Sequence, residues 1–277
     1  MILIVRLTIW ETFRRKVLLS SLVMTGVFLW LFWLEVSHEP RLAITQNPLA
    51  DVTSAVANLG LGAFFCYVVI AFFAIFSVSG AISSEIESGM LAAVVPRPVY
   101  RAEIVLGKWV GFALVQLCYV SFLFFSMVVV IGAFDARILP PPAAIVAAWA
   151  LFVGEAWILS AVGLLGSVLL PTLTNGITLA LGFLVAFLSG GLAQIPVGQS
   201  AVVDRIATVM DLLLPTDGLY RRAVFEMTHN SQSLIALNVL GPFGVLKVPN
   251  DAFLAYALVY LVGVLALTVR FFHRRDI

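Results

Sequence analysis

The sequence predicts an all-α integral membrane protein with six transmembrane helices. Of its 277 residues, 62% are hydrophobic and 11% are charged, and the mean hydropathy is +1.08. Soluble domains are about 45–50% apolar and about 25% charged. The apolar runs are also longer than the strands of an outer-membrane barrel, and they lack the alternation of such strands. At about 20 residues per crossing, we expect spans near 17–36, 56–81, 102–133, 144–170, 173–196 and 252–272.

Residues 1–16 precede the first span and have the pattern of an amphipathic helix. Four apolar residues recur at helical spacing, with arginines elsewhere on the helix: Ile2, Val5, Ile9 and Phe13. This pattern predicts a helix that lies in the membrane interface. A signal peptide is the alternative. It is disfavoured because the apolar run 17–34 is too long for its hydrophobic region and no small-residue cleavage site follows.

The segment between the second and third spans, residues 82–101, is unusually polar and extends into the charged start of the next span. Charged residues gather here: Glu85, Glu87, Arg97, Arg101, Glu103 and Lys108. Ser84 and Glu87 have the spacing of a capping box, which predicts a short helix from Ser84 to about residue 95. Prolines at 96 and 98 should end it, and a new helix should begin near Tyr100. We interpret 82–101 as a coupling helix and its flank, which a soluble partner could bind.

The order and spacing of six residues in this region resemble the cytoplasmic loop of ABC-2 type transporter permeases: Glu85, Gly89, Pro98, Arg101, Gly107 and Lys108. The pattern is most similar to the permeases of nitrous-oxide-reductase maturation and to related multidrug and lipid exporters. Met90 stands where that family usually has threonine, and Pro96 is an additional proline. A generic charged loop between two spans is the alternative. The resemblance implies a single ABC-2 type transmembrane domain over 1–277. It also implies that these residues, together with Glu87, couple the chain to an ATPase.

Positive charge predicts the orientation of the spans. With the N-terminus inside, ten of the sixteen lysines and arginines fall in inner segments and six in outer segments. Because lysine and arginine favour the cytoplasmic side, both termini are expected there. We therefore expect a multi-pass protein of the inner (plasma) membrane, with 197–251 as an extracytoplasmic loop.

The chain lacks the motifs of an enzyme. Gly107-Lys108 is not preceded by the glycine of a phosphate-binding loop, and Trp109 follows where such a loop needs serine or threonine. We therefore expect ATP hydrolysis in a partner subunit. The three histidines lie in separate segments outside the spans, so neither a metal site nor another cofactor is expected. An intramembrane enzyme would need a pair of catalytic groups at matching depth, and Glu155 is the single candidate.

Glu155 lies well inside the fourth predicted span. Charged residues at such positions are rare, and they usually face protein or a water-filled path. Two interpretations remain open. Glu155 could line or gate the substrate pathway, or it could be a protonated or hydrogen-bonded packing residue.

The loop 197–251 contains two apolar stripes at helical spacing. The first consists of Val202, Ile206, Val209 and Leu213, and the second of Leu219, Ala223 and Met227. The segment 215–218 should turn the second helix back onto the first, and Arg222 and Glu226 are spaced to pair. The family resemblance implies outer amphipathic helices against the outer ends of the last two spans, covering the pathway exit through Ile206, Val209 and Leu213.

Together these features predict the permease subunit of an ATP-driven ABC exporter. One six-span chain provides half of a pathway, so we expect a homodimer or pairing with a related permease. The expected partners are two copies of a cytoplasmic ABC ATPase and membrane lipid, and an extracytoplasmic partner is a further candidate. With a net charge of +1, no nucleic-acid partner is expected. The alternative is a non-transporting scaffold or sensor that docks an extracytoplasmic partner through 197–251.

Overall fold

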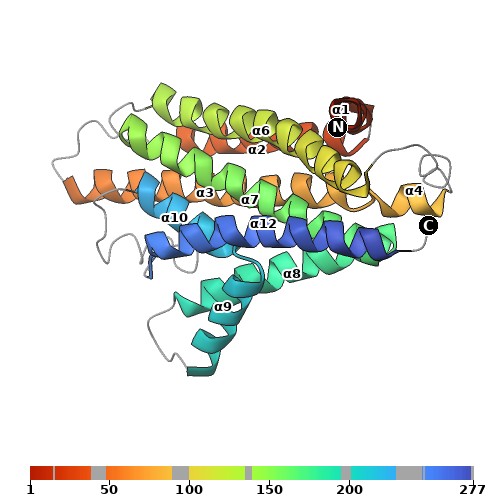
Figure 1. Ribbon diagram of the computed structural model, residues 1–277. Helices are drawn as coiled ribbons and strands as arrows, with labels where there is room; N and C mark the ends of the chain where they lie inside the picture. Colours follow the sequence, from red (N-terminus) through yellow and green to blue (C-terminus); the bar gives the residue numbers. More distant parts are fainter. Residues whose placement is uncertain are drawn as a thin grey trace.

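The computed structural model describes residues 1–14, 16–38, 48–88, 100–134, 139–194, 201–228, 245 and 247–275. Every regular element in these ranges is an α-helix (Figure 1). Six helices are long and apolar enough to cross a membrane: α2 (Lys16–His38), α3 (Pro48–Val78), α6 (Arg101–Phe134), α7 (Pro142–Leu169), α8 (Thr172–Ala193) and α12 (Asp251–Arg274). The predicted fold class and the six spans are therefore confirmed.

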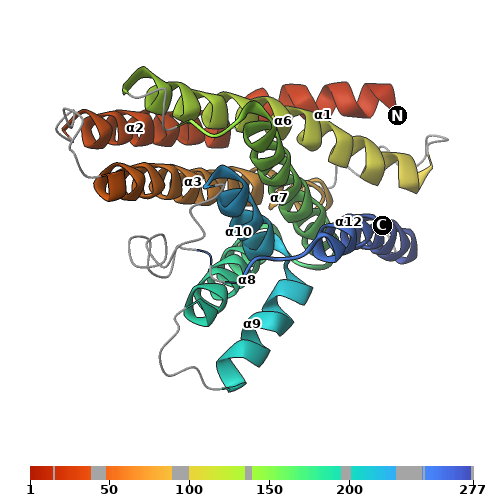
Figure 2. The same cartoon turned by 90° about the vertical axis from the view of Figure 1, so that its left-hand side faces the viewer.

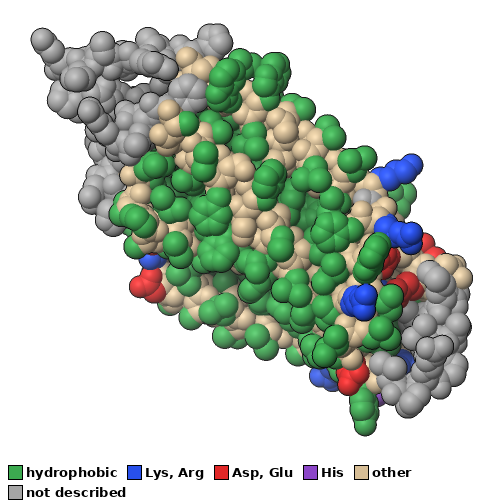
Figure 3. All heavy atoms as spheres, turned by 90° about the horizontal axis from the view of Figure 1, so that it is seen from above, with side chains coloured by type: hydrophobic (Ala, Val, Ile, Leu, Met, Phe, Trp, Pro, Cys, Tyr) green, Lys and Arg blue, Asp and Glu red, His purple; other side chains and the backbone are tan. Residues whose placement is uncertain are grey.

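The surface of the bundle has the character of a lipid-facing belt. Hydrophobic side chains cover the middle of the molecule, and charged side chains gather toward one end of the visible face (Figure 3). On α2, for example, Leu19, Val23 and Trp30 are each at least 60% exposed. Soluble monomers rarely expose apolar patches of this extent, so we assign this surface to the bilayer.

Helix α7 forms the centre of the bundle. It packs against α3, α6 and α12, and also against the shorter helix α10 (Thr216–Met227). Large side chains fill the space around it, and Tyr67, Phe73, Phe124 and Phe152 are almost completely buried. Gly163 lets α8 approach closely, because a Cβ there would lie 3.1 Å from the Leu179 side chain. The core therefore combines aromatic filling with close helix contacts at a small residue.

Helix α1 (Ile2–Arg14) lies across the direction of the spans, at the end of the bundle where both termini are found (Figure 1). It packs on α6 at Gly107 and Gly111. A Cβ at Gly111 would lie 2.7 Å from the Thr8 Cβ, and one at Gly107 would lie 3.0 Å from the Ile4 Cγ2. The two glycines are four residues apart, so they form one flat face on α6 that receives α1.

The predicted apolar stripe of the first helix contacts the bundle only in part, because Ile9 packs against the main core and Val5 is half-buried. Thr8 and Thr12 are buried there, and their hydroxyls donate to the carbonyls of Ile4 and Thr8 at 2.9 and 2.8 Å. Ile2 and Phe13 remain 87% and 61% exposed. Short side chains whose hydroxyls are satisfied locally allow close helix contact, which leaves the large apolar residues available to lipid. A position in the membrane interface remains a prediction.

The two outer helices have different surroundings. α10 packs chiefly against α7, and its stripe of Leu219, Ala223 and Met227 is buried. α9 (Ala201–Leu213) packs against α8 and projects from the bundle (Figure 2). Its predicted stripe is exposed, at 61% for Val202, 46% for Ile206, 51% for Val209 and 61% for Leu213.

The prediction that the second outer helix folds back onto the first is therefore wrong. Only two residues separate the end of α9 from Thr216, the first residue of α10. Even so, α10 does not pack mainly on α9, but enters the space between α7, α3 and α8. α10 makes a larger apolar contact inside the bundle than it makes with α9, and this contact determines where α10 packs. α9 is held at its C-terminal end, where the hydroxyls of Tyr256 and Tyr260 donate to the carbonyls of Leu212 and Leu213. These two bonds satisfy carbonyl groups that a helix end leaves without partners.

Candidate functional site

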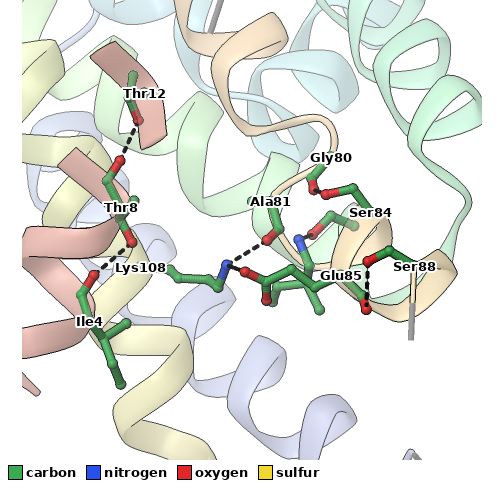
Figure 4. Close-up of polar contacts among 11 residues, drawn as sticks. Ile4, Thr8, Thr12, Gly80, Ala81, Ser84, Glu85, Ser88 and Lys108 are labelled. Carbon is green, nitrogen blue, oxygen red and sulfur yellow. Dashed lines mark hydrogen bonds and ion pairs between the residues drawn. The ribbon is translucent and has the colours of Figure 1, made fainter. Parts of the chain in front are cut away.

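Helix α4 (Ser83–Glu87) lies between α3 and α6, at the end of the molecule that carries both termini (Figure 1). The predicted capping box is absent. The helix begins one residue earlier than expected, after Ile82, and its N-cap has no side-chain hydrogen bond. The Ser84 hydroxyl donates instead to the Gly80 carbonyl (Figure 4). α4 follows directly on the turn that ends α3, so the Gly80 carbonyl of that turn, four residues before Ser84, is within reach of the Ser84 hydroxyl.

Lys108 and Glu85 form an ion pair that joins α6 to α4 (Figure 4). The Lys108 Nζ lies 2.6 Å from the Glu85 Oε1 and donates a second bond to the Ala81 carbonyl at 2.7 Å. The Lys108 side chain is only 6% exposed, and that of Glu85 is 23% exposed. Because a buried ammonium group is costly unless paired, Glu85 and Ala81 together hold this charge in place.

Glu87 joins α4 to the start of α8. Its Oε1 accepts the backbone N–H of Thr172 at 3.1 Å, and the Ser83 and Thr172 hydroxyls are 2.8 Å apart. Thr172 is the first residue of α8. The first amides of a helix have no partner within the helix, and its dipole favours a negative group there. Glu87 thus acts as a cap for α8.

Three further hydrogen bonds join this end of α3, α7 and α8 to one another. The Ile82 N–H donates to the Ser167 hydroxyl of α7 at 3.2 Å. The buried Asn175 of α8 donates from Nδ2 to the carbonyls of Ser79 and Gly163, at 2.8 and 2.9 Å. The chain around α4 is therefore bonded to α6, α7 and α8 together.

Arg101, at the start of α6, holds the end of α12. Its Nη1 donates to the carbonyls of Phe272 and His273 at 3.1 Å each, and to that of Arg275 at 2.8 Å. Its guanidinium carbon also lies 6.0 Å from the centre of the Phe272 ring. A cation is favourable at a helix C-terminus, where carbonyls are unpaired and the dipole is negative. Arg101 therefore links the first turn of α6 to the last turn of α12.

We call this cluster the α4 junction and define it as Glu85, Glu87, Arg101, Lys108 and Thr172. Four of the seven residues predicted for coupling make bonds between helices at this end of the bundle. Gly107 serves instead as part of the α1 contact on α6. Gly89 and Pro98 lie outside the described residues. Sequence reasoning missed Thr172, which has no charge and lies 85 residues from its partner Glu87. The α4 junction holds helices together.

Glu155 is completely enclosed near the middle of α7. Neither carboxylate oxygen has a hydrogen-bond partner in the described part of the chain. It lies close enough to Asp217 of α10 for the two charges to interact. The structure thus places it between helices within one chain.

A family model for the ABC-2 family transporter protein matches residues 10–277. The chain belongs to the ABC-2 family of transporter proteins. The comparison with curated proteins found no match. The chain is therefore a multi-pass membrane protein and a permease component of an ABC transporter, a kind of subunit that works with a separate ATPase.

The permease also contains a buried ion pair that sequence reasoning missed. The Arg221 Nε lies 2.6 Å from the Asp217 Oδ2, and Nη2 donates to Oδ1 at 3.0 Å. Both side chains are at most 2% exposed. The predicted pair of Arg222 and Glu226 is confirmed, with the Arg222 Nε 2.8 Å from Oε1. Asp217 and Arg221 have the same four-residue spacing, and this signal could have revealed the pair.

Proposed function

We propose that the permease is the membrane-spanning subunit of an ATP-driven exporter, and that a separate cytoplasmic ATPase moves it through α4. The observation that carries this proposal is the α4 junction, in which one five-residue helix is bonded to α6 through Glu85 and to α8 through Glu87. Arg101 extends the connection to α12. A displacement of α4 would therefore be transmitted to three spans.

In this mechanism, ATP-dependent closure of two ATPase copies pushes on α4 in each of two permease copies. The bonded spans then tilt between inward- and outward-open states, and nucleotide binding biases the equilibrium between them. A homodimer in the inner membrane with cytoplasmic termini suits this arrangement. The substrate classes of the nitrous-oxide-reductase maturation permeases and of the multidrug and lipid exporters are the starting candidates for cargo.

The docking surface on α4 differs from the one that the sequence suggested. Glu85 is engaged by Lys108, and one oxygen of Glu87 by Thr172, so their charges already serve the junction. Ser88, at the C-terminal end of α4, is exposed. We therefore propose that the ATPase approaches the exposed end of α4 around Ser88.

A photo-cross-linking residue placed at Ser88 tests this docking. We expect it to form an adduct with the ATPase in the assembled transporter. The matched control is the same residue at Asp251, whose side chain is 87% exposed at the opposite end of the bundle, and it should give no adduct. Adducts at Asp251 but not at Ser88 would overturn the orientation and the coupling role together. A chain that never associates with an ATPase would favour the alternative of a scaffold that docks a partner through 197–251.

We further propose that Glu155 belongs to the transport pathway. Because it is enclosed within one chain, this role requires α7 and α10 to separate during the cycle. Glu155→Gln should then lower substrate-stimulated ATP hydrolysis severalfold without reducing the amount of permease in the membrane, and Glu155→Leu should lower it further. Gln116→Met is the matched control, since Gln116 is also buried and without a hydrogen-bond partner in the described part of the chain. Normal hydrolysis in both Glu155 variants would assign it to packing.

A further inference from the structure

A pocket of about 480 Å³ opens at the end of the bundle opposite α4. It lies between the end of α8, the outer helices α9 and α10, and the segment that leads into α12. Apolar side chains such as Ala207, Leu212 and Phe253 form much of its wall. Ligand sites in proteins usually occupy about 300–1,000 Å³ and combine apolar walls with a few polar groups. This pocket has the size and the mixed lining of such a site.

The polar lining of the pocket includes one carboxylate whose hydrogen bonding is incomplete. Asp217 and Arg221 reach the pocket but neutralise each other through two hydrogen bonds. Asp211 accepts a bond from the Gly218 N–H, but its Oδ1 is buried and has no hydrogen-bond partner in the described part of the chain. Buried acceptors are almost always bonded. An acceptor without a protein partner in the wall of a pocket is available to a donor from water or from a ligand.

We propose that this pocket, which we call the outer pocket, binds an organic amine with an apolar body, and that the Asp211 carboxylate receives its ammonium group. The apolar wall around Phe253 would contact the body of the ligand. The pocket opens on the face opposite α4, so the ligand would enter or leave on the outer side. The proposal does not depend on coupling to the ATPase, because binding is a property of the permease alone.

The charges around Asp211 predict how binding should vary with pH. Burial, followed by the nearby Asp217 carboxylate, raises the pKa of Asp211 to about 7, although Arg221 and the Gly218 N–H oppose this shift. Glu155 of α7 interacts with Asp217 from the bundle side, and Lys247 lines the pocket from the segment before α12. An alkylammonium group keeps its proton at neutral pH, as lysine does with a pKa near 10.4. Binding should therefore strengthen as Asp211 loses its proton.

The test measures binding of phenethylamine to the full-length permease in nanodiscs without an ATPase, by calorimetric titration with empty nanodiscs as the blank. We expect saturable binding whose Kd falls about fivefold between pH 6 and pH 7, and about tenfold between pH 6 and pH 8, before it levels off. Asp211→Asn should weaken binding at pH 8 at least tenfold and remove the pH dependence. Asp251→Asn is the matched control, because it changes an exposed carboxylate at the same end of the bundle that pairs with Arg222 and does not line the pocket, and binding should not change.

A second variant keeps the test informative if Asp211→Asn does not fold. Lys247 is exposed, and Lys247→Met should tighten phenethylamine binding severalfold by removing a like charge from the pocket. Phenethyl alcohol, which has the same apolar body without the charge, should bind at least tenfold more weakly than the amine. Equal binding of the amine and the alcohol, or no saturable binding at pH 8, would overturn the proposal. Normal export alongside such a result would leave the proposed transport function intact.

Discussion

Asp217→Asn is expected to lower the free energy of unfolding of the permease by about 3–5 kcal/mol, because it removes the carboxylate that makes two hydrogen bonds with a buried arginine. Arg221 is 2% exposed and makes two bonds to this carboxylate, at 2.6 and 3.0 Å. Arginine cannot lose its proton in a protein, so it cannot escape the cost by becoming neutral. The effect should be seen as a lower midpoint of unfolding in mixed micelles.

Replacing the arginine of this pair should lower the free energy of unfolding by less than replacing the aspartate. Arg221→Met leaves Asp217 buried, but a carboxyl group can take up a proton, and burial already raises the pKa of Asp217 above its ordinary value. We therefore expect Asp217→Asn to destabilise the permease more than Arg221→Met does. The neighbouring pair provides the control, since Glu226→Gln removes a partner with the same spacing but 20% exposure. Partly exposed pairs contribute about 0–1 kcal/mol, so equal losses in Asp217→Asn and Glu226→Gln would refute the argument.

Glu85→Gln is expected to lower the free energy of unfolding by about 2–3 kcal/mol, below the full cost of breaking a buried pair because Glu85 is partly solvated. Lys108 would keep the Ala81 carbonyl as a partner but lose its counter-charge. If α4 drives the spans, this variant should also reduce substrate-stimulated ATP hydrolysis, because α4 would move without pulling α6. Chemical unfolding and hydrolysis measured on the same preparation test the two effects separately.

Two further variants complete this experiment. Glu103→Gln is the matched control, because Glu103 is 44% exposed and pairs with the N-terminal amine at 3.4 Å, so its loss should be small. Combining Glu85→Gln with Lys108→Met should recover much of the lost stability, since replacing both members of a buried pair is often close to neutral. Recovered stability without recovered hydrolysis would support coupling through the ion pair. Full activity in Glu85→Gln would exclude it.

The outer helices show that a sequence pattern can predict a helix without predicting which surface the helix contacts. The spacing of apolar residues correctly predicted two amphipathic helices, but the turn between them is at 214–215 rather than 215–218, because residues 216–218 already belong to α10. It could not predict what each stripe would contact, because Val209 of α9 and Leu219 of α10 carry the same signal. One is 51% exposed and the other is 4% exposed. The difference comes from α7, which offers α10 a deep apolar surface and leaves α9 to contact α8.

The sequence by itself determined the features that depend on neighbouring residues. Six apolar stretches of sufficient length determined the spans, because each stretch satisfies its own backbone as a helix in lipid. The four-residue spacing of Arg222 and Glu226 likewise determined that pair. Only the tertiary structure decided the α4 junction. Lys108 could have met any carboxylate, and its partner lies 23 residues away, while Arg101 holds carbonyls 171 to 174 residues away. Such pairings depend on which helix ends the packing of the bundle brings together, and charge alone does not specify a partner.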